Sequence, residues 1–364
     1  MFRTVLAIVV VALTIHRVAA DWPLYRGDAL MSGVGRAKLP EQLDERWVFK
    51  TKNAIEGAPA VVNGTVYVGS LDKFLYAIDL ATGKDKWSVK LGAFRASPSV
   101  RGDRLYIGDI DGRFYCVNIA DGKTLWKFEC DGEISSGCNF HGDNILFGSH
   151  DSTLYCLDAN GKKVWDVKTE GPVNGSPVVV GDTTFVAGCD EVLHILDAKT
   201  GKELGSVPLG GQAAATAAVS GDVSYVGTMT NQVVAIDWKK RTKLWDFEAR
   251  VQSQPFFSSA VVTPDLIVAG SRDRKVYGLD RKTGKSLWNF ETDGAVDGSP
   301  VVVGNRIYVG CLSNDGNFYV LDLKSGKKVQ ELNLDSPVTG SVAVGPDCIL
   351  VGTDKGSLYC LGAK

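Results

Sequence analysis

The sequence predicts an all-β fold, an eight-bladed β-propeller of four-stranded blades whose ring is closed by an N-terminal strand. Three observations support this prediction. A segment of about forty residues recurs eight times, each copy contains four short strand patterns, and the last copy lacks one strand that lies before the first copy. Together they predict a single propeller over residues 44–364, with the closing strand at 44–52 and the blades from residue 57 onward.

A glycine ends the second strand pattern of every copy and fixes the period of the repeat. Successive glycines are 39 to 43 residues apart, a length that suits four short strands and their turns. A helical solenoid would need apolar residues at a 3.6-residue spacing, and this sequence shows no such pattern of convincing length. The eight positions are Gly69, Gly108, Gly148, Gly188, Gly227, Gly270, Gly310 and Gly352.

Within each copy, turn residues separate short runs of β-branched and aromatic residues. The first copy reads AVVNGTVYVG, then LYAID, ATGK and DKWSV, so that Asn-Gly joins the first two runs and Thr-Gly-Lys joins the last two. These residues accept the positive φ angles of tight hairpin turns. We therefore expect each copy to form one antiparallel, four-stranded blade.

The two ends of the repeat region complete each other. The last copy begins at Gly340 and ends with the chain after YCLGAK, before its fourth strand. The segment LDERWVFKT, which precedes the first copy, has the pattern of that fourth strand and places Trp47 in the tryptophan position of the repeat. Pairing the two segments would close the ring and remove its open sheet edges.

The first twenty residues differ from the rest of the chain. Arg3 precedes an apolar run from Val5 to Ile15, and small residues lead to Ala20, which is typical of a secretory signal peptide over residues 1–20. The alternative, a membrane anchor, is disfavoured because a bilayer of roughly 30 Å requires about 20 apolar residues. We therefore predict an exported protein, periplasmic or secreted, with no transmembrane segment after cleavage and a lead-in at 21–43.

Composition excludes some functions. The net charge of −2 at pH 7 gives no sign of nucleic-acid binding, and we expect a soluble monomer. Most of the eight cysteines occupy repeat positions that small residues fill in other copies, so we expect few or no disulfides. After export, His141, His150 and His194 remain, and their spacing fits no metal motif.

A tryptophan recurs in the fourth strand pattern of six blades. Such a side chain can lie flat on the next blade, and burying it contributes on the order of 2–3 kcal/mol. We interpret these residues as structural docking groups. Gly205 and Gln330 replace the tryptophan in two copies, which we interpret as drift or, alternatively, as a rim modified for a partner. The docking tryptophans are Trp47, Trp87, Trp126, Trp165, Trp245 and Trp288.

Several motifs carry a resemblance to a known family. The segments AIDLATGKDKW at 77–87 and YGLDRKTGKSLW at 277–288 resemble the docking motif of the PQQ-like, quinoprotein-type propellers. The start DWPLYRG resembles openings that precede such repeats in exported bacterial proteins, and the resemblance covers essentially the whole mature chain. In size, blade number and export the chain is most similar to the BamB-like outer-membrane assembly factors, but it lacks their lipid-attachment cysteine.

The resemblance implies two kinds of function. The quinone-dependent dehydrogenases resemble this chain only in the repeat, and those similar to the alcohol dehydrogenases hold the cofactor with an adjacent cysteine pair, a calcium site and a catalytic aspartate. This sequence has no adjacent cysteines and no C-x-x-C-H haem motif. We therefore predict a protein that is not an enzyme, with no catalytic residues and no cofactor or metal site.

The loops from each fourth strand to the next first strand should surround the central channel, together with the middle loops. A scaffold fixes such loops while their sequence varies, and aromatic and arginine residues there are typical of protein-binding hot spots. We predict an exported, non-catalytic scaffold that binds a protein partner in the cell envelope, and the resemblance implies outer-membrane protein assembly and a position peripheral to that membrane. The alternatives are a PQQ-dependent oxidoreductase and a carbohydrate-binding propeller. The predicted partner-binding rim consists of Phe94, Arg95, His150, Phe256, Phe257, Arg272 and Arg274.

Overall fold

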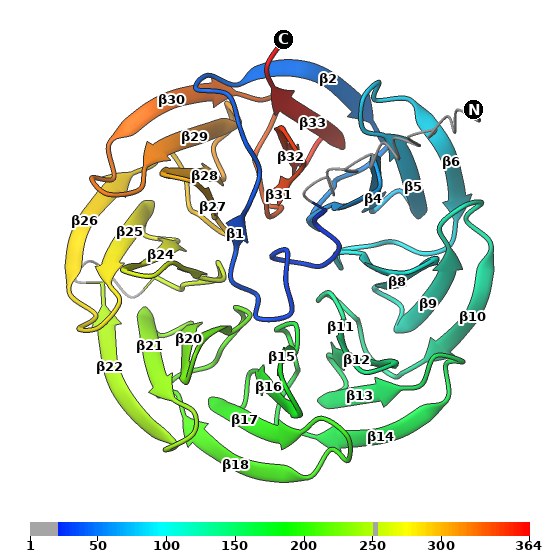
Figure 1. Cartoon of the computed structure of the whole chain (residues 1–364), viewed down its shortest axis with the longest axis vertical. Coiled ribbons are helices and arrows are strands. Elements are labelled where there is room, and N and C mark those ends of the chain that lie inside the picture. Colours follow the sequence, from blue (N-terminus) through cyan, green and yellow to red (C-terminus); the bar gives the residue numbers. More distant parts are fainter. Residues whose placement is uncertain (1–20, 250–253) are drawn as a thin grey trace, which may run out of the picture.

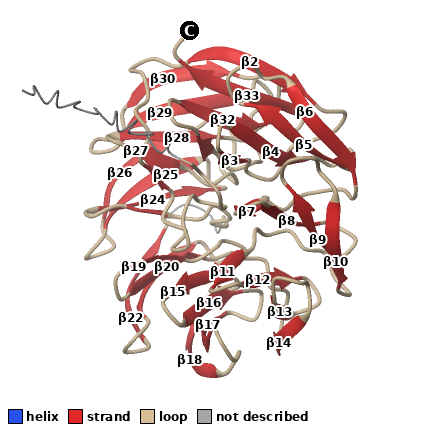
Figure 2. Ribbon diagram, turned by 45° about the vertical axis from the view of Figure 1, so that its right-hand side comes forward, coloured by secondary structure: helices blue, strands red, loops and turns tan. Residues whose placement is uncertain are grey.

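The computed structural model describes residues 21–249 and 254–364, and the predicted signal peptide lies outside the described residues. In these two ranges the regular elements are all β-strands, and they form eight sheets around a common axis (Figure 1). Figure 2 shows the same ring turned by 45°, with loops joining the strands of each blade. The predicted eight-bladed all-β propeller is confirmed.

The first four blades are each built from consecutive antiparallel strands, with the shortest strand nearest the axis. Blade 1 contains β3 (Ala60–Val62), β4 (Thr65–Gly69), β5 (Phe74–Asp79) and β6 (Asp85–Lys90). Blade 2 contains β7 (Ser99–Arg101), β8 (Arg104–Gly108), β9 (Arg113–Asn118) and β10 (Thr124–Glu129). Blade 3 contains β11 (Asn139–His141), β12 (Asn144–Ser149), β13 (Thr153–Leu157) and β14 (Lys163–Lys168). Blade 4 contains β15 (Val178–Val180), β16 (Thr183–Ala187), β17 (Val192–Asp197) and β18 (Glu203–Pro208).

The other four blades continue the order, but blade 7 gains an added inner strand and blade 8 takes its fourth strand from the segment that precedes blade 1. Blade 5 contains β19 (Ala218–Ser220), β20 (Val223–Gly227), β21 (Gln232–Asp237) and β22 (Thr242–Glu248). Blade 6 contains β23 (Val261–Val262), β24 (Leu266–Ser271), β25 (Lys275–Asp280) and β26 (Ser286–Glu291). Blade 7 contains β27 (Val301–Val303), β28 (Arg306–Gly310), β29 (Asn317–Asp322) and β30 (Lys328–Asn333), and β1 (Val34–Gly35) pairs with β27 in parallel. Blade 8 contains β31 (Ala343–Val344), β32 (Cys348–Gly352), β33 (Ser357–Gly362) and β2 (Asp44–Lys50).

The turns behave as their residues predict. Asn63 and Gly64, between β3 and β4, have φ angles of 50° and 70°, as a two-residue turn with positive φ at both positions requires. In the β5–β6 turn, the backbone N–H and the hydroxyl of Thr82 donate to the Asp79 carboxylate at 3.0 and 2.8 Å. These hydrogen bonds from Thr82 lower the pKa of Asp79. The Thr-Gly-Lys motif therefore serves turn formation.

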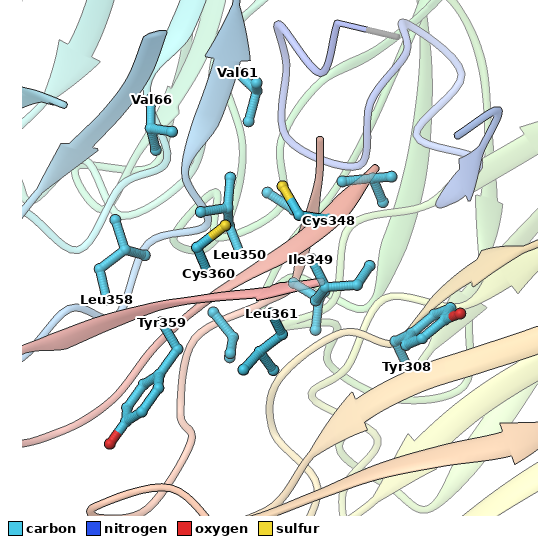
Figure 3. Close-up of a cluster of buried hydrophobic side chains, with 14 of the residues drawn as sticks. Val61, Val66, Tyr308, Cys348, Ile349, Leu350, Leu358, Tyr359, Cys360 and Leu361 are labelled. Atoms are coloured by element: carbon cyan, nitrogen blue, oxygen red, sulfur yellow. The ribbon is translucent and has the colours of Figure 1, made fainter. Parts of the chain in front are cut away.

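Strand β2 closes the ring by pairing antiparallel with β33, so that Trp47 lies opposite Cys360. The Arg46 guanidinium adds two hydrogen bonds to the Asp347 carboxylate, both at 2.9 Å. Buried apolar side chains then join the closing blade to its neighbours. Val61 of blade 1 and Tyr308 of blade 7 belong to the same cluster as the blade 8 side chains (Figure 3). The chain ends are thus held by backbone pairing, an ion pair and a shared core.

Six of the eight joints between blades follow one pattern, in which a tryptophan lies on a glycine of the next blade. At the joint between blades 2 and 3, Trp126 Nε1 donates to the Ala159 carbonyl at 3.0 Å. A Cβ on Gly161 would come within 2.6 Å of the same indole, so any other residue would displace the ring. The other pairs are Trp47 on Gly83, Trp87 on Gly122, Trp165 on Gly201, Trp245 on Gly284 and Trp288 on Gly326.

The joint between blades 4 and 5 replaces both members of the pair. Gly205 stands in the tryptophan position, and Arg241 stands in the glycine position of the β21–β22 turn. The arginine side chain fills the space that an indole would occupy, since a Cβ on Gly205 would lie 2.4 Å from Arg241 Nε. Each replacement therefore accounts for the other, and neither drift nor a modified rim is needed to explain Gly205.

The joint between blades 7 and 8 lacks the tryptophan–glycine pair for a different reason. Blade 8 has no turn between its third and fourth strands, because β2 comes from the other end of the chain. Leu43, just before β2, takes the place of that turn. Gln330 accepts a hydrogen bond from the Leu43 N–H at 2.8 Å and donates one to the Leu43 carbonyl at 2.7 Å. The glutamine is thus matched to the chain ends.

The lead-in at 21–43 runs through the centre of the ring, which the sequence did not reveal (dark blue in Figure 1). It covers the inner edges of the first strands and contacts the blades in the order of their numbers. In blade 3 the contact is a side-chain one, from Asn139 Nδ2 to the Ala29 carbonyl at 2.9 Å. In blades 1, 2, 4, 5, 6 and 7 a backbone N–H of the first strand donates to the lead-in. The donors are Val61, Val100, Val179, Val219, Val262 and Val302, and the acceptors are the carbonyls of Trp22, Pro23, Ala29, Leu30, Ser32 and Gly33.

The opening motif DWPLYRG supplies the residues that anchor this segment. Gly27 has a φ of 89°, and a Cβ there would meet the Trp22 ring at 2.6 Å. The Arg26 side chain is buried and donates to the carbonyls of Ala260, at 2.9 Å, and Pro300. Burial lowers the pKa of Arg26 to about 10. The motif therefore places a buried cation, solvated by backbone carbonyls, against the inner edges of blades 6 and 7.

Candidate binding site at the centre of the ring

The loops from each fourth strand to the next first strand place equivalent residues around the axis. In every such loop a buried apolar residue is followed by the residue that we call the mouth position. Six of the eight mouth positions line one cavity of about 470 Å³, which we call the funnel. The mouth positions are Glu56, Arg95, Ser135, Asn174, Ala214, Phe257, Asp297 and Thr339, and the last two are not among the funnel-lining residues.

A second tier lies two residues further along each loop, where six blades carry serine or threonine. In this hydroxyl tier, a backbone N–H of one blade donates to the hydroxyl of the next blade. The Ser176 N–H donates to Thr216 at 2.8 Å, and the Thr216 N–H donates to Ser259 at 3.0 Å. Equivalent bonds run from Ala58 to Ser97, from Ser259 to Ser299 and from Ser299 to Ser341. The tier thus ties neighbouring blades together.

Tyr25 of the lead-in lies at the bottom of the funnel. Its hydroxyl is 2.8 Å from Ser299 Oγ and 3.2 Å from Ser259 Oγ. The tier has no side chain at Gly137, and this is where Tyr25 passes, because a Cβ on Gly137 would lie 3.1 Å from Tyr25 Cβ. The lead-in therefore closes the inner end of the funnel.

The charged side chains of the funnel are paired with one another. Arg95 Nε lies 3.1 Å from Glu56 Oε2, and Arg95 NH1 lies 3.4 Å from Glu133 Oε1. Burial raises the pKa of Glu56, although the Arg95 charge opposes this shift. His150 Nε2 makes a hydrogen bond of 3.0 Å with Ser135 Oγ.

Phe257 forms an aromatic part of the funnel wall, and its position is fixed from behind. The Arg272 guanidinium lies 4.2 Å from the ring centroid. Arg272 also donates to the two oxygens of Asp297, at 2.8 and 2.6 Å. An arginine held in this way stacks on the aromatic ring and keeps it in place.

The structure brings together part of the predicted rim. Arg95, His150 and Phe257 line the funnel, and Arg272 supports Phe257. Arg274 is not among the lining residues; its Nε donates to the Thr292 carbonyl at 3.4 Å in the turn between β24 and β25.

The prediction of a rim position is wrong for two residues, Phe94 and Phe256. Phe94 and Phe256 have no exposed surface and pack where Gly69 and Gly227 leave room for their rings. They occupy the apolar position that Ile55, Val173 and Val296 fill in other copies, so the repeat itself contained the signal.

Several residues of the site were missed. Glu56, Glu133 and Tyr25 were not singled out, and neither was the hydroxyl tier. The recurring Ser-Pro before the first strand was a usable signal for the tier, whereas no local pattern places Tyr25 on the axis.

Other features of the described residues add little to the site. The eight cysteines are all present as thiols. In the ranges 21–249 and 254–364, no group of three histidine, cysteine or acidic side chains is placed to hold a metal ion. Over the same ranges, no helix has the length and apolarity needed to cross a membrane.

The fold and the repeat define an eight-bladed β-propeller. The family model described as "Beta-alanine-activating enzyme, beta-propeller" matches residues 93–363, and the chain belongs to this family. A comparison with curated proteins found no match.

Solved structures share the fold at low sequence identity. BamB from Moraxella catarrhalis has a TM-score of 0.74 and 19% identity, and the match covers 88% of this chain and 100% of that one. The computationally designed Ika8 protein has a TM-score of 0.74 and 18% identity, covering 86% and 98%. Quinohemoprotein alcohol dehydrogenase from Comamonas testosteroni has a TM-score of 0.79 and 13% identity, covering 94% and 80%. These similarities establish the fold alone.

Proposed function

We propose that this chain is an exported, non-catalytic scaffold that binds a protein partner in the cell envelope through the face that carries the funnel. The observation that carries the proposal is the kind of side chain that the funnel presents: Arg95 is half-exposed there, and Phe257 lines the same cavity. Arginine and aromatic side chains are enriched at protein-binding hot spots. The structural similarity to BamB supports a scaffold role in envelope assembly.

A PQQ-dependent oxidoreductase is the second candidate. The similarity to a quinohemoprotein alcohol dehydrogenase, with a TM-score of 0.79, favours it at the level of the fold. The two candidates differ in what they require from the funnel. A scaffold needs only an accessible mouth, whereas an oxidoreductase needs bound quinone.

The test blocks the funnel without removing any of its interactions. Ala214 is a mouth position with a small side chain, so Ala214→Trp should fill the funnel. Leu244→Trp, at a half-exposed position on the outer strand β22, is the matched control. Each tagged variant is cross-linked in the native envelope, and the captured proteins are identified by mass spectrometry.

We expect one protein to be captured by the wild type and by Leu244→Trp and to be lost with Ala214→Trp. Equal capture by all three would place the partner elsewhere and refute the proposed face. Purified protein incubated with pyrroloquinoline quinone and calcium provides the other arm. Dye-linked alcohol oxidation that Ala214→Trp abolishes would replace the scaffold with the oxidoreductase.

A further inference from the structure

We infer that the funnel is also a binding site for a neutral, polyhydroxylated small molecule, that is, a sugar. This inference goes beyond the proposed protein partner and concerns the inner part of the same funnel. It rests on three features of the funnel: unsatisfied neutral hydroxyls, charges that are already paired, and a closed inner end with an aromatic wall.

Two buried serines supply the unsatisfied hydroxyls. Ser136 and Ser176 line the funnel, their exposed fractions are 7% and 2%, and neither Oγ has a hydrogen-bond partner among the described residues. Buried hydroxyls in native proteins are rarely left without a partner. A serine oxygen moves between staggered positions by rotation about χ1, without backbone movement. Either hydroxyl can therefore turn to a ligand without giving up an existing bond.

Ser176 departs from the tier pattern on one side. Its own N–H donates to Thr216, as the pattern requires. Its hydroxyl, however, receives no hydrogen bond from the neighbouring blade, where Gly137 holds the tier position. The Ser176 hydroxyl is therefore left without a protein partner at the wall of the funnel.

The pairing of the charges favours a neutral ligand. Glu56 and Glu133 already share Arg95, so an added cation would compete with that arginine and an added anion would face two carboxylates. The Glu56 carboxylate is partly buried, and this burial raises its pKa, so a further negative charge beside it is disfavoured. A neutral ligand leaves the three groups paired.

The shape of the funnel favours a compact ring over an extended chain. Tyr25 closes the inner end, so a ligand enters and leaves through one mouth. The volume of about 470 Å³ falls within the range of small-molecule sites. Phe257 provides an apolar surface, held by Arg272, for the C–H face of a sugar ring. Hydroxyl partners and one aromatic surface together match a saccharide.

The test measures sugar binding to the full folded protein by saturation-transfer NMR and calorimetry. The probes are cellobiose, maltose and N-acetylglucosamine as neutral sugars, and glucosamine, glucuronate and glycine as charged ligands. The double variant Ser136→Ala/Ser176→Ala removes only hydroxyls that have no partner, so its melting temperature should match that of the wild type. Ser224→Ala is the matched control, because Ser224 is a buried serine whose hydroxyl also has no partner among the described residues but does not line the funnel.

We expect at least one neutral sugar to bind, the double variant to weaken binding about tenfold or more, and Ala214→Trp to abolish it. Ser224→Ala should retain binding within a few-fold of wild type. Binding should change by less than about twofold between low and high salt, because no ligand charge is screened.

The inference is overturned if no neutral sugar binds, if only charged probes bind, or if the double variant binds as well as the wild type. The sugar could come from a polysaccharide or from a free saccharide, and sedimentation with an insoluble polysaccharide distinguishes the two. Depletion of the protein from the supernatant indicates that it binds the end of a glycan. Binding of free sugars alone indicates a soluble ligand. These readouts use no protein partner, so sugar binding can fail while capture succeeds, and the reverse.

Discussion

At the scale of single residues, the joints between blades show how strongly neighbouring copies depend on each other. A tryptophan is accommodated only where the next blade offers a glycine in its turn, as with Trp126 on Gly161. Where the glycine becomes Arg241, the tryptophan becomes Gly205. The residues that must match one another therefore lie on the two sides of a joint and not within one blade.

The joint between blades 4 and 5 can be converted to the common pattern. Gly205→Trp alone should lower the free energy of unfolding by about 1–3 kcal/mol, because the indole and Arg241 compete for one space. Arg241→Gly alone should also destabilise, since it leaves the space unfilled. The double variant should be more stable than the two single effects predict, as measured by urea unfolding in a double-mutant cycle. Additive losses would show that the two positions do not share this space.

The ion pair that holds the closing strand predicts a pH dependence. The hydrogen bonds from Arg46 lower the pKa of Asp347, with the positive charge adding to the shift. A carboxylate with a lowered folded-state pKa stabilises the fold above its unfolded pKa, about 3.9, and loses this contribution as pH falls through the folded value. Asp347→Asn should therefore cost about 0.2–1 kcal/mol at pH 7, because the pair is partly exposed.

The same variant tests the sign of this pH dependence. The difference in stability between wild type and Asp347→Asn should shrink as pH falls below about 4 and vanish when the carboxylate is protonated in both states. Thermal unfolding across pH 2 to 7 measures it. A difference that persists at about pH 2 would mean that Asp347 acts through packing and not through charge.

At the scale of elements, closure depends on one strand. Strand β2 supplies the outer edge of blade 8, and Trp47 docks on Gly83 of blade 1. Deleting residues 44–50 removes both contacts and exposes the edge of β33. We expect the melting temperature to fall by about 10 °C or more and association to appear in light scattering. Glu45→Ala, at an exposed position of the same strand, should change neither; an unaltered melting curve for the deletion would contradict closure.

The predictability of the elements follows from the repeat. The strands, the turns and the closing role of β2 could be predicted because eight copies of the repeat share one pattern and the last copy lacks one strand. The buried position of Phe94 was also readable, because the equivalent residue in other copies is Ile55 or Val173. Glu56 and Glu133 were not readable as partners of Arg95, because such contacts form only when different blades meet around the axis.

At the scale of the whole molecule, the lead-in joins the blades from inside. It lacks any repeat pattern, and so its course was not predictable from the sequence. Its carbonyls accept from the first strands of blades 1, 2, 4, 5, 6 and 7. The resulting contacts connect parts of the ring that are far apart in the chain.

Removing this segment should loosen the ring at its centre. Deleting residues 22–35 should lower the melting temperature and speed amide exchange at the inner N–H groups, which lose their acceptors. Hydrogen exchange should show this loss at Val179 and Val219, whereas Leu75, at the centre of blade 1, should keep its protection. Unchanged exchange at Val179 and Val219 would mean that the segment is not held in this place in solution.

The order in which the lead-in contacts the blades has a consequence for the size of the ring. Between Trp22 and Gly33 a chain of fixed length meets the blades in turn, from blade 1 to blade 7, before β1 pairs with β27. A ring with one blade fewer would leave carbonyls facing no donor, and a ring with one blade more would leave a first strand uncovered. The length of this segment therefore matches one circumference of the ring, so that gain or loss of a blade would require a compensating change between Trp22 and Gly35.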